Sequence, residues 1–135
     1  LVPVKVSLNF KVKQVAAGVR HLLLLDEESN VHECGNVYFG LLGLRETPQL
    51  IGREHFDGED IQTIACGNCF SLALSTNGTV FGWGVACGAL GCEDYDYNIV
   101  YPIKLAGPVV EAYKILQISA GHSFAALVGK RFVSE

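Results

Sequence analysis

Five cysteines offer metal or redox chemistry in this 135-residue chain. Cys66-x-x-Cys69 and Cys87-x4-Cys92 have the spacing of a loose zinc knuckle, and zinc needs about four such ligands in a tetrahedral array. The alternatives are redox use of Cys66 and Cys69, or simple buried thiols. Cys34 makes the count odd, and without a signal sequence an odd count favours reduced thiols in an intracellular compartment. We therefore expect reduced, metal-free cysteines.

Four histidines could act as bases, but the sequence pairs none of them with a nucleophile. His21 and His122 have no such partner at triad-like spacing, and we expect His32, His55 and His122 in loops or on the surface. A phosphate-binding loop is also missing, because Gly129-Lys130 is followed by arginine instead of serine or threonine. We predict no catalytic residue and no cofactor site.

One acidic, tyrosine-rich segment is a candidate contact loop. Its residues are Glu93, Asp94, Tyr95, Asp96 and Tyr97. An EF-hand calcium loop beginning at Asp94 would need glycine at 99 and glutamate at 105, where the chain has Ile99 and Leu105. Exposed loops on a rigid scaffold carry binding, and tyrosine is enriched at interface hot spots. The segment is either a partner-contact loop or a merely solvated one.

The composition indicates a folded domain with few exposed charges. Half of the residues are hydrophobic and the formal net charge is −4, which argues against disorder and against a phosphate-binding surface. We interpret Lys5, Lys11 and Lys13 as a solvated strand face rather than a nucleic-acid patch. Residues 1–6 alternate as a strand would, and no stretch approaches the roughly 20 apolar residues that span a bilayer.

A repeat places these residues on common elements. Three similar segments cover residues 14–25, 63–74 and 117–128, and their glycines at 18, 67 and 121 lie 49 and 54 residues apart. Each has a small-residue triplet ending in that glycine, followed by an apolar run. In the second segment Asn77-Gly78 then favours a tight hairpin turn. We expect strands near 14–25, 30–34, 63–74, 79–83 and 117–128, and only 109–116 could form two helical turns.

These units resemble the repeats of the regulator of chromosome condensation family. The matching residues of the second unit are Cys66-Gly67, Ser71–Leu74, Gly78, Val80, Trp83-Gly84, Gly88, Leu90 and Gly91. The resemblance implies a β-propeller and a structural, hydrogen-bonding role between blades for His21. Several positions depart from the family pattern. They are Phe70 and Phe124 for the repeat histidine, Cys34 for the tryptophan, and Leu41 and Ala89 for a glutamine.

We therefore predict an all-β fold, a β-propeller fragment of about two and a half repeat units. The units run over residues 1–48, 49–102 and 103–135, the last of them truncated. Propellers close with roughly 4 to 8 blades, so we expect open edges that self-associate or pair with missing blades.

The function that this architecture predicts is protein–protein interaction rather than catalysis. By resemblance, the alternatives are a part of a guanine-nucleotide exchange factor for a small GTPase, and an accessory propeller of a HECT-type ubiquitin ligase. The expected partner is a protein, a small GTPase under the first alternative. We expect no membrane or nucleic-acid partner for this segment, and an intracellular location, cytoplasmic or nuclear.

Overall fold

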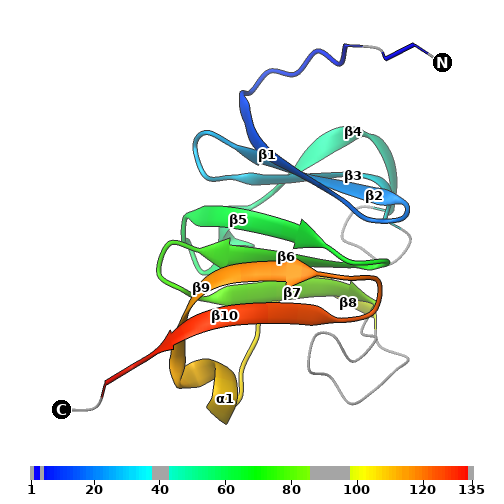
Figure 1. Ribbon diagram of the computed structural model, residues 1–135. Helices are drawn as coiled ribbons and strands as arrows, with labels where there is room; N and C mark the ends of the chain where they lie inside the picture. Colours follow the sequence, from blue (N-terminus) through cyan, green and yellow to red (C-terminus); the bar gives the residue numbers. More distant parts are fainter. Residues whose placement is uncertain (1, 4, 38–42, 86–97, 134–135) are drawn as a thin grey trace.

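The strands of the described residues form three antiparallel sheets, stacked in chain order (Figure 1). The computed structural model describes residues 2–3, 5–37, 43–85 and 98–133. The first sheet contains β1 (Val12–Ala17), β2 (His21–Asp26), β3 (Val31–Val37) and β4 (Gly43–Ile51). The second contains β5 (Ile61–Cys66), β6 (Phe70–Ser75), β7 (Val80–Val85) and β8 (Asn98–Lys104). The third pairs β9 (Tyr113–Ala120) with β10 (Ala125–Arg131). The predicted all-β fold is confirmed.

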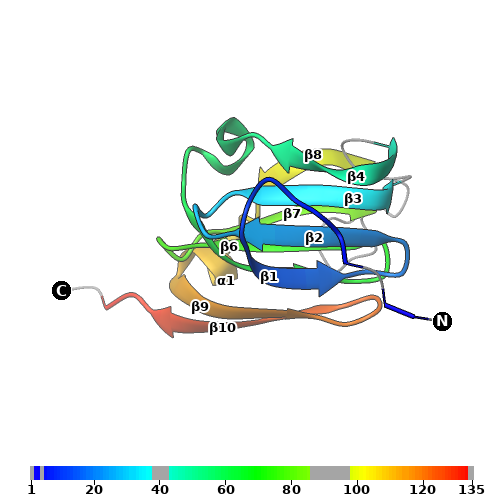
Figure 2. The ribbon, with the colours of Figure 1, turned by 90° about the horizontal axis from the view of Figure 1, so that it is seen from above.

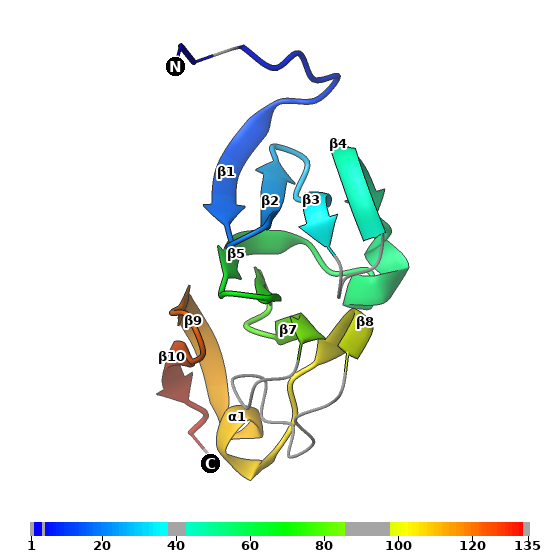
Figure 3. The ribbon, with the colours of Figure 1, turned by 90° about the vertical axis from the view of Figure 1, so that its right-hand side faces the viewer.

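Corresponding strands of successive sheets lie on the same side of the molecule. The first strands β1, β5 and β9 follow one another along one side, and the fourth strands β4 and β8 lie along the other (Figures 2 and 3). Each four-stranded sheet is a meander, so every strand pairs with its chain neighbour. Four-stranded sheets stacked face to face with equivalent strands in line are the blades of a β-propeller.

Each stretch predicted as one long strand is instead a hairpin. The chain turns at the glycine of each small-residue triplet, where Gly18, Gly67 and Gly121 each donate their amide to the carbonyl three residues later. The ring of that third residue lies across the glycine. A Cβ on Gly67 would come within 2.0 Å of the Phe70 ring, and one on Gly18 within 2.2 Å of the His21 ring. The prediction of continuous strands was wrong because these glycines turn the chain.

The segments before β1 and β9 also differ from expectation. Residues 2–3 and 5–11 form no strand, although the sequence alternates there. Of the stretch 109–116, which could have formed two helical turns, only the start is helical, in α1 (Pro108–Glu111), because the chain then enters β9 and pairs with β10. Among the described residues no helix is long and apolar enough to cross a membrane.

The spaces between successive sheets are filled by two apolar clusters. The first lies between the first and second sheets. Its members are Leu23, Leu25, Val31, Ile51, Phe56, Ile61, Ile64, Ala73, Phe81 and Trp83. The second, between the second and third sheets, contains Phe70, Leu72, Leu74, Val80, Leu105, Ile115 and Ile118. Every residue of β6 is buried, because alternate side chains of this strand face different neighbours. We call these two interfaces the first seam and the second seam.

A 3-10 helix, η1 (Arg53–Phe56), carries an aromatic side chain into the first seam. The Phe56 ring is 1% exposed and meets Phe81 edge-on, with ring centroids 5.4 Å apart. It meets Trp83 in the same manner at 5.8 Å. Edge-to-face aromatic pairs of this kind add about 0.5–1.5 kcal/mol beyond the burial of their area. The loop between the two sheets is therefore anchored in the core.

Gly84 tests whether the backbone of the second sheet tolerates a side chain. Its φ is 106°, and a Cβ would lie 2.4 Å from the carbonyl oxygen of Cys69. Gly58 is the matched control, because its φ of 73° is also positive but a Cβ there would meet nothing within 4 Å. We expect Gly58→Ala to cost about 1–2 kcal/mol of unfolding free energy. Gly84→Ala should cost about 1–3 kcal/mol more, because backbone atoms must also move. Equal losses in urea unfolding would contradict this packing.

Candidate functional site

The residues predicted for partner contact, and two of the four cysteines weighed as zinc ligands, lie outside the described residues. These are Glu93, Asp94, Tyr95, Asp96 and Tyr97, together with Cys87 and Cys92. Of the remaining thiols, that of Cys66 points at the first sheet and donates to the carbonyl of Ala16 at 3.5 Å. Burial raises the pKa of Cys66 to about 12. A thiol held protonated in this way is a poor nucleophile and a poor metal ligand at neutral pH.

His21 forms a buried hydrogen bond across the first seam. Its Nε2 lies 3.0 Å from the hydroxyl oxygen of Ser71, and the two side chains come from β2 and β6. Burial lowers the pKa of His21, and a backbone hydrogen bond at Phe70 only partly offsets this effect. The neutral imidazole therefore joins two sheets, which confirms its predicted structural role between blades. Both residues are buried, with His21 8% and Ser71 2% exposed.

Two further polar links cross the first seam. Gln14 clamps the main chain of Ile64, because its Nε2 donates to the Ile64 carbonyl at 3.1 Å and its Oε1 accepts from the Ile64 amide at 3.0 Å. The indole Nε1 of Trp83 donates to Glu33 at 3.2 Å. All these partners are 50 residues apart. The first two units repeat every 49 residues. Each of these side chains therefore contacts the residue that directly follows its equivalent in the second unit.

Backbone hydrogen bonds link the sheets at equivalent places in both seams. The Val19 amide donates to the Asn68 carbonyl, and the Asn68 amide in turn donates to the His122 carbonyl. These three residues occupy the same position in successive units. At the other end of the strands, the Ile61 amide donates to Ser29 and the Ile115 amide donates to Gly78. The main chain therefore repeats its contacts even where the side chains differ.

The second seam replaces polar side-chain links by apolar packing. Phe70 occupies the position of His21 and is fully buried in the second cluster. Ala125, which stands where the first seam has Ser71, packs against the same cluster. The departure from the repeat histidine that the sequence showed at Phe70 therefore changes the chemistry of the seam but keeps its geometry.

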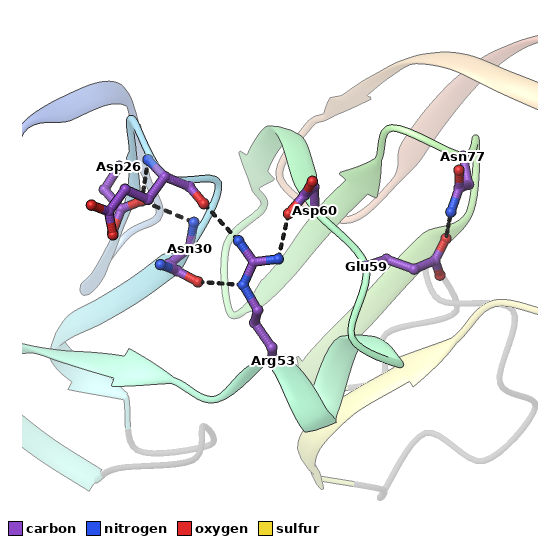
Figure 4. Close-up of polar contacts among 7 residues, drawn as sticks. Asp26, Asn30, Arg53, Glu59, Asp60 and Asn77 are labelled. Carbon is purple, nitrogen blue, oxygen red and sulfur yellow. Dashed lines mark hydrogen bonds and ion pairs between the residues drawn. The ribbon is translucent and has the colours of Figure 1, made fainter.

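At the end of the first seam where β2 turns into β3, the loop between β4 and β5 binds that hairpin turn of the first sheet (Figure 4). Arg53 donates from Nε to the side-chain oxygen of Asn30 at 2.8 Å and from Nη2 to the carbonyl of Glu28 at 2.6 Å. It also forms an ion pair with Asp60 of its own loop. Asp26 closes the turn, because its carboxylate accepts the amides of Glu28 and Asn30 at 2.9 Å each. The guanidinium is thus held by two segments at once.

The same loop binds the corresponding turn of the second sheet through Glu59. One carboxylate oxygen accepts hydrogen bonds from Ser75 at 3.1 Å and from the side-chain amide of Asn77 at 2.8 Å. Around these contacts the surface is mainly acidic. The exposed carboxylates on the two turns and the loop belong to Glu27, Glu28, Glu54, Asp57 and Asp60. We call this surface, built from residues 26–30, 52–60 and 75–79, the loop face.

His32 does not lie in a loop, so that expectation was wrong. It lies in β3 and is 8% exposed, with its Nε2 2.8 Å from Asp26 and the Phe10 ring stacked on it at 3.8 Å. Burial alone would raise the pKa of Asp26, but hydrogen bonds from His32 and two amides outweigh it and lower that pKa. His122 is exposed in the β9–β10 turn, as expected, and His55 is half-buried in η1.

Residues 61–88 match the family model described as the regulator of chromosome condensation (RCC1) repeat. The chain is 27% identical over 121 residues to the regulator of chromosome condensation of Mus musculus, an alignment of 85% of this chain and 28% of that protein. It is 32% identical over 123 residues to the probable E3 ubiquitin-protein ligase HERC6 of Homo sapiens, covering 87% of this chain and 12% of the ligase. The chain thus spans little more than a quarter of these relatives at most.

Solved structures show the same fold. Prp20p of Saccharomyces cerevisiae, whose structure was described together with its binding properties to Gsp1p and histones, superposes with a TM-score of 0.80. The match covers 96% of this chain and 33% of that one, at 17% identity. Human WBSCR16 superposes with a TM-score of 0.78 at 24% identity, covering 92% of this chain and 32% of that one. At these identities the likeness shows the fold, and the predicted propeller fragment is confirmed.

The His21–Ser71 link predicts a coupled effect on stability. Ser71→Ala leaves a buried imidazole nitrogen without its partner, so we expect a loss of about 1–3 kcal/mol of unfolding free energy. In a His21→Phe background, which copies Phe70 of the next unit, Ser71→Ala should cost much less. A double-mutant cycle in urea measures the difference, with the exposed Ser123→Ala as control. Strictly additive losses would show that the two side chains do not interact.

Proposed function

We propose that this chain, which belongs to the regulator of chromosome condensation repeat family, is a protein–protein interaction module. It is a segment of a β-propeller scaffold of that family. The observation that carries the proposal is the loop face. There Arg53 and Glu59 hydrogen-bond to the turns of two different sheets, although they are six residues apart on one loop. Because binding residues concentrate on loops that a rigid scaffold positions, this surface suits recognition of another protein.

The charge of the loop face indicates the chemistry of a partner. Its exposed carboxylates outnumber its basic side chains, and Arg53 is already engaged in hydrogen bonds and an ion pair. A partner surface that presents lysine or arginine would be attracted to this face and oriented by it. Phosphate groups would be repelled, in keeping with a chain of net charge −4. We therefore propose a protein partner, and neither nucleic acid nor membrane.

We propose no catalytic chemistry for the segment itself. The His21–Ser71 pair resembles a base and a nucleophile, but both side chains are buried between sheets. The thiol of Cys66 is held protonated by burial. Each of these groups is engaged in holding neighbouring sheets together. An intracellular location, cytoplasmic or nuclear, agrees with the reduced thiols that the sequence predicts, and we propose it on that ground.

Two relatives favour a more specific role. Prp20p, which shares the fold, was described with its binding to Gsp1p and histones. A part of a guanine-nucleotide exchange factor for a small GTPase, which the family resemblance implies, is the second candidate. It would act by pressing a propeller face against the nucleotide site, without covalent chemistry. The third candidate is an accessory propeller of a HECT-type ubiquitin ligase, which the 32% identity to HERC6 favours.

A photo-crosslinking amino acid placed on the loop face tests the interaction proposal. We expect position 54 to give a discrete crosslinked protein in cells, because Glu54 is exposed beside Arg53. Position 122, which lies in a turn at the opposite ends of the strands, is the matched control. The double charge reversal Glu27→Lys/Glu54→Lys should reduce the crosslink several-fold, since like charges facing each other across an interface oppose association. Equal crosslinking at 54 and 122, or none at 54, would contradict the proposal.

Nucleotide release separates the first two candidates. A small GTPase loaded with a fluorescent guanine nucleotide is mixed with the chain, and binding and release are followed together. Binding without accelerated release supports an interaction module. Accelerated release that the double charge reversal abolishes would instead support exchange activity. If the wild type and the double charge reversal accelerate release equally, the exchange activity does not depend on the loop face.

A further inference from the structure

Two of the described carboxylates of the first sheet are buried, and they differ in how many hydrogen bonds they accept. Asp26 is 5% exposed and accepts hydrogen bonds from His32 and from two amides. Glu33 is 1% exposed, and its Oε1 accepts one hydrogen bond, from Trp83. Its Oε2 is buried and has no hydrogen-bond partner among the residues that the structure describes. A buried charge is tolerated when it is paired and hydrogen-bonded. Asp26 meets this condition and can be ionised in its buried position, whereas Glu33 does not and is favoured there in its neutral form.

Glu33 lies inside the first seam rather than at its rim. It is two residues after Val31 on β3, so both side chains point to the same face, and Val31 belongs to the apolar cluster of that seam. Its cross-strand partners are Leu23 and Gln49. Trp83, which binds it, comes from the second sheet and is fully buried. The unpaired carboxyl oxygen is therefore enclosed between the two sheets.

We propose that Glu33 is a pH-sensitive latch of the first seam, which is tight while this carboxyl group is protonated and loosens when the group ionises. In the protonated form, one neutral carboxyl group with one hydrogen bond lies among apolar side chains. In the ionised form, a full negative charge occupies the same place, and the described side chains place no cation beside it. Hydration would stabilise that charge, and water reaches it only if the two sheets separate. Ionisation thus favours opening of the seam.

Among the described residues, the titratable neighbours of Glu33 do not neutralise it. Cys34 on its own strand and Cys66 on β5 lie near it, and its negative charge contributes to raising the pKa of both thiols. His21 is on the neighbouring strand β2, but burial lowers its pKa and keeps it neutral. Burial likewise raises the pKa of Glu33 to about 7, although the hydrogen bond from Trp83 opposes this effect. The change of charge therefore falls near neutral pH.

The direction of the pH effect follows from linkage. The pKa of Glu33 rises from 4.5 when exposed to about 7 in the closed seam, so the closed form binds its proton more tightly. The stabilisation is complete below pH 4.5 and is lost as pH rises to about 7. Over that interval the equilibrium constant for opening should rise by about tenfold per pH unit. Above about pH 7 it should stay constant. His21 acts in the opposite sense, because its low pKa destabilises the closed form as pH falls.

The experiment compares urea unfolding of the 135-residue chain and its Glu33→Gln variant from pH 5 to 8. The amide keeps an acceptor for Trp83 but cannot ionise. We expect the ratio of the two unfolding constants, wild type over variant, to rise about tenfold per pH unit up to about pH 7 and then level off. Taking the ratio removes the contribution of His21. Glu27→Gln, which removes the same charge from an exposed site, should give a ratio that stays flat.

A second measurement holds even if the variant folds poorly. Trp83 is the sole tryptophan of the chain, so its indole N–H gives a single resonance that reports on the Glu33 carboxyl group. We expect this resonance in the wild type to titrate with a midpoint near pH 7, and no such titration in Glu33→Gln. A wild-type resonance that is unchanged between pH 5 and 8 would overturn the latch. So would a titration that survives in Glu33→Gln, because it would belong to His21, and so would a flat ratio of unfolding constants.

Discussion

Face-to-face packing of successive sheets is the constraint on which the rest of this structure depends. No single sheet can bury its own faces, so each must present a surface that fits the next one. Strand β6 shows how this is met, with Phe70 and Leu72 facing the second seam and the smaller Ser71 and Ala73 facing the first. Large side chains on one face and small ones on the other let the sheets approach closely enough for side chains to hydrogen-bond across them.

Within this frame the repeat conserves main-chain contacts and varies the side chains. The same amide–carbonyl bonds cross both seams, yet His21 supplies a polar link where Phe70 supplies apolar packing. A polar seam is more directional, because a displaced partner leaves a buried group unsatisfied. It can also carry a group such as Glu33, whose charge depends on pH. Departure from the repeat pattern therefore gives the two seams different physical properties within one architecture.

The loop that joins the first two sheets combines structural and surface roles. Phe56 anchors it in the core, while Arg53 and Glu59 tie it to the turns on either side. Fixing a loop at several points removes the entropy that binding would otherwise have to remove, so an exposed residue such as Glu54 is held ready for a partner. The stability of the first seam and the shape of the loop face are therefore physically connected.

The sequence by itself determined the all-β class and the repeat, because strand alternation and glycine spacing are local and recur in every unit, and the family resemblance implied the role of His21. It also indicated the turn at Asn77-Gly78. Only the tertiary structure decided which residues meet across a seam. The residue that each linking side chain contacts across the first seam lies one position beyond that side chain's repeat equivalent. This stagger is set by the packing of the two sheets against each other. The burial of Glu33 follows from that packing, because the second sheet covers it. His32 is on the opposite face of β3, where Phe10 of the segment before β1 covers it.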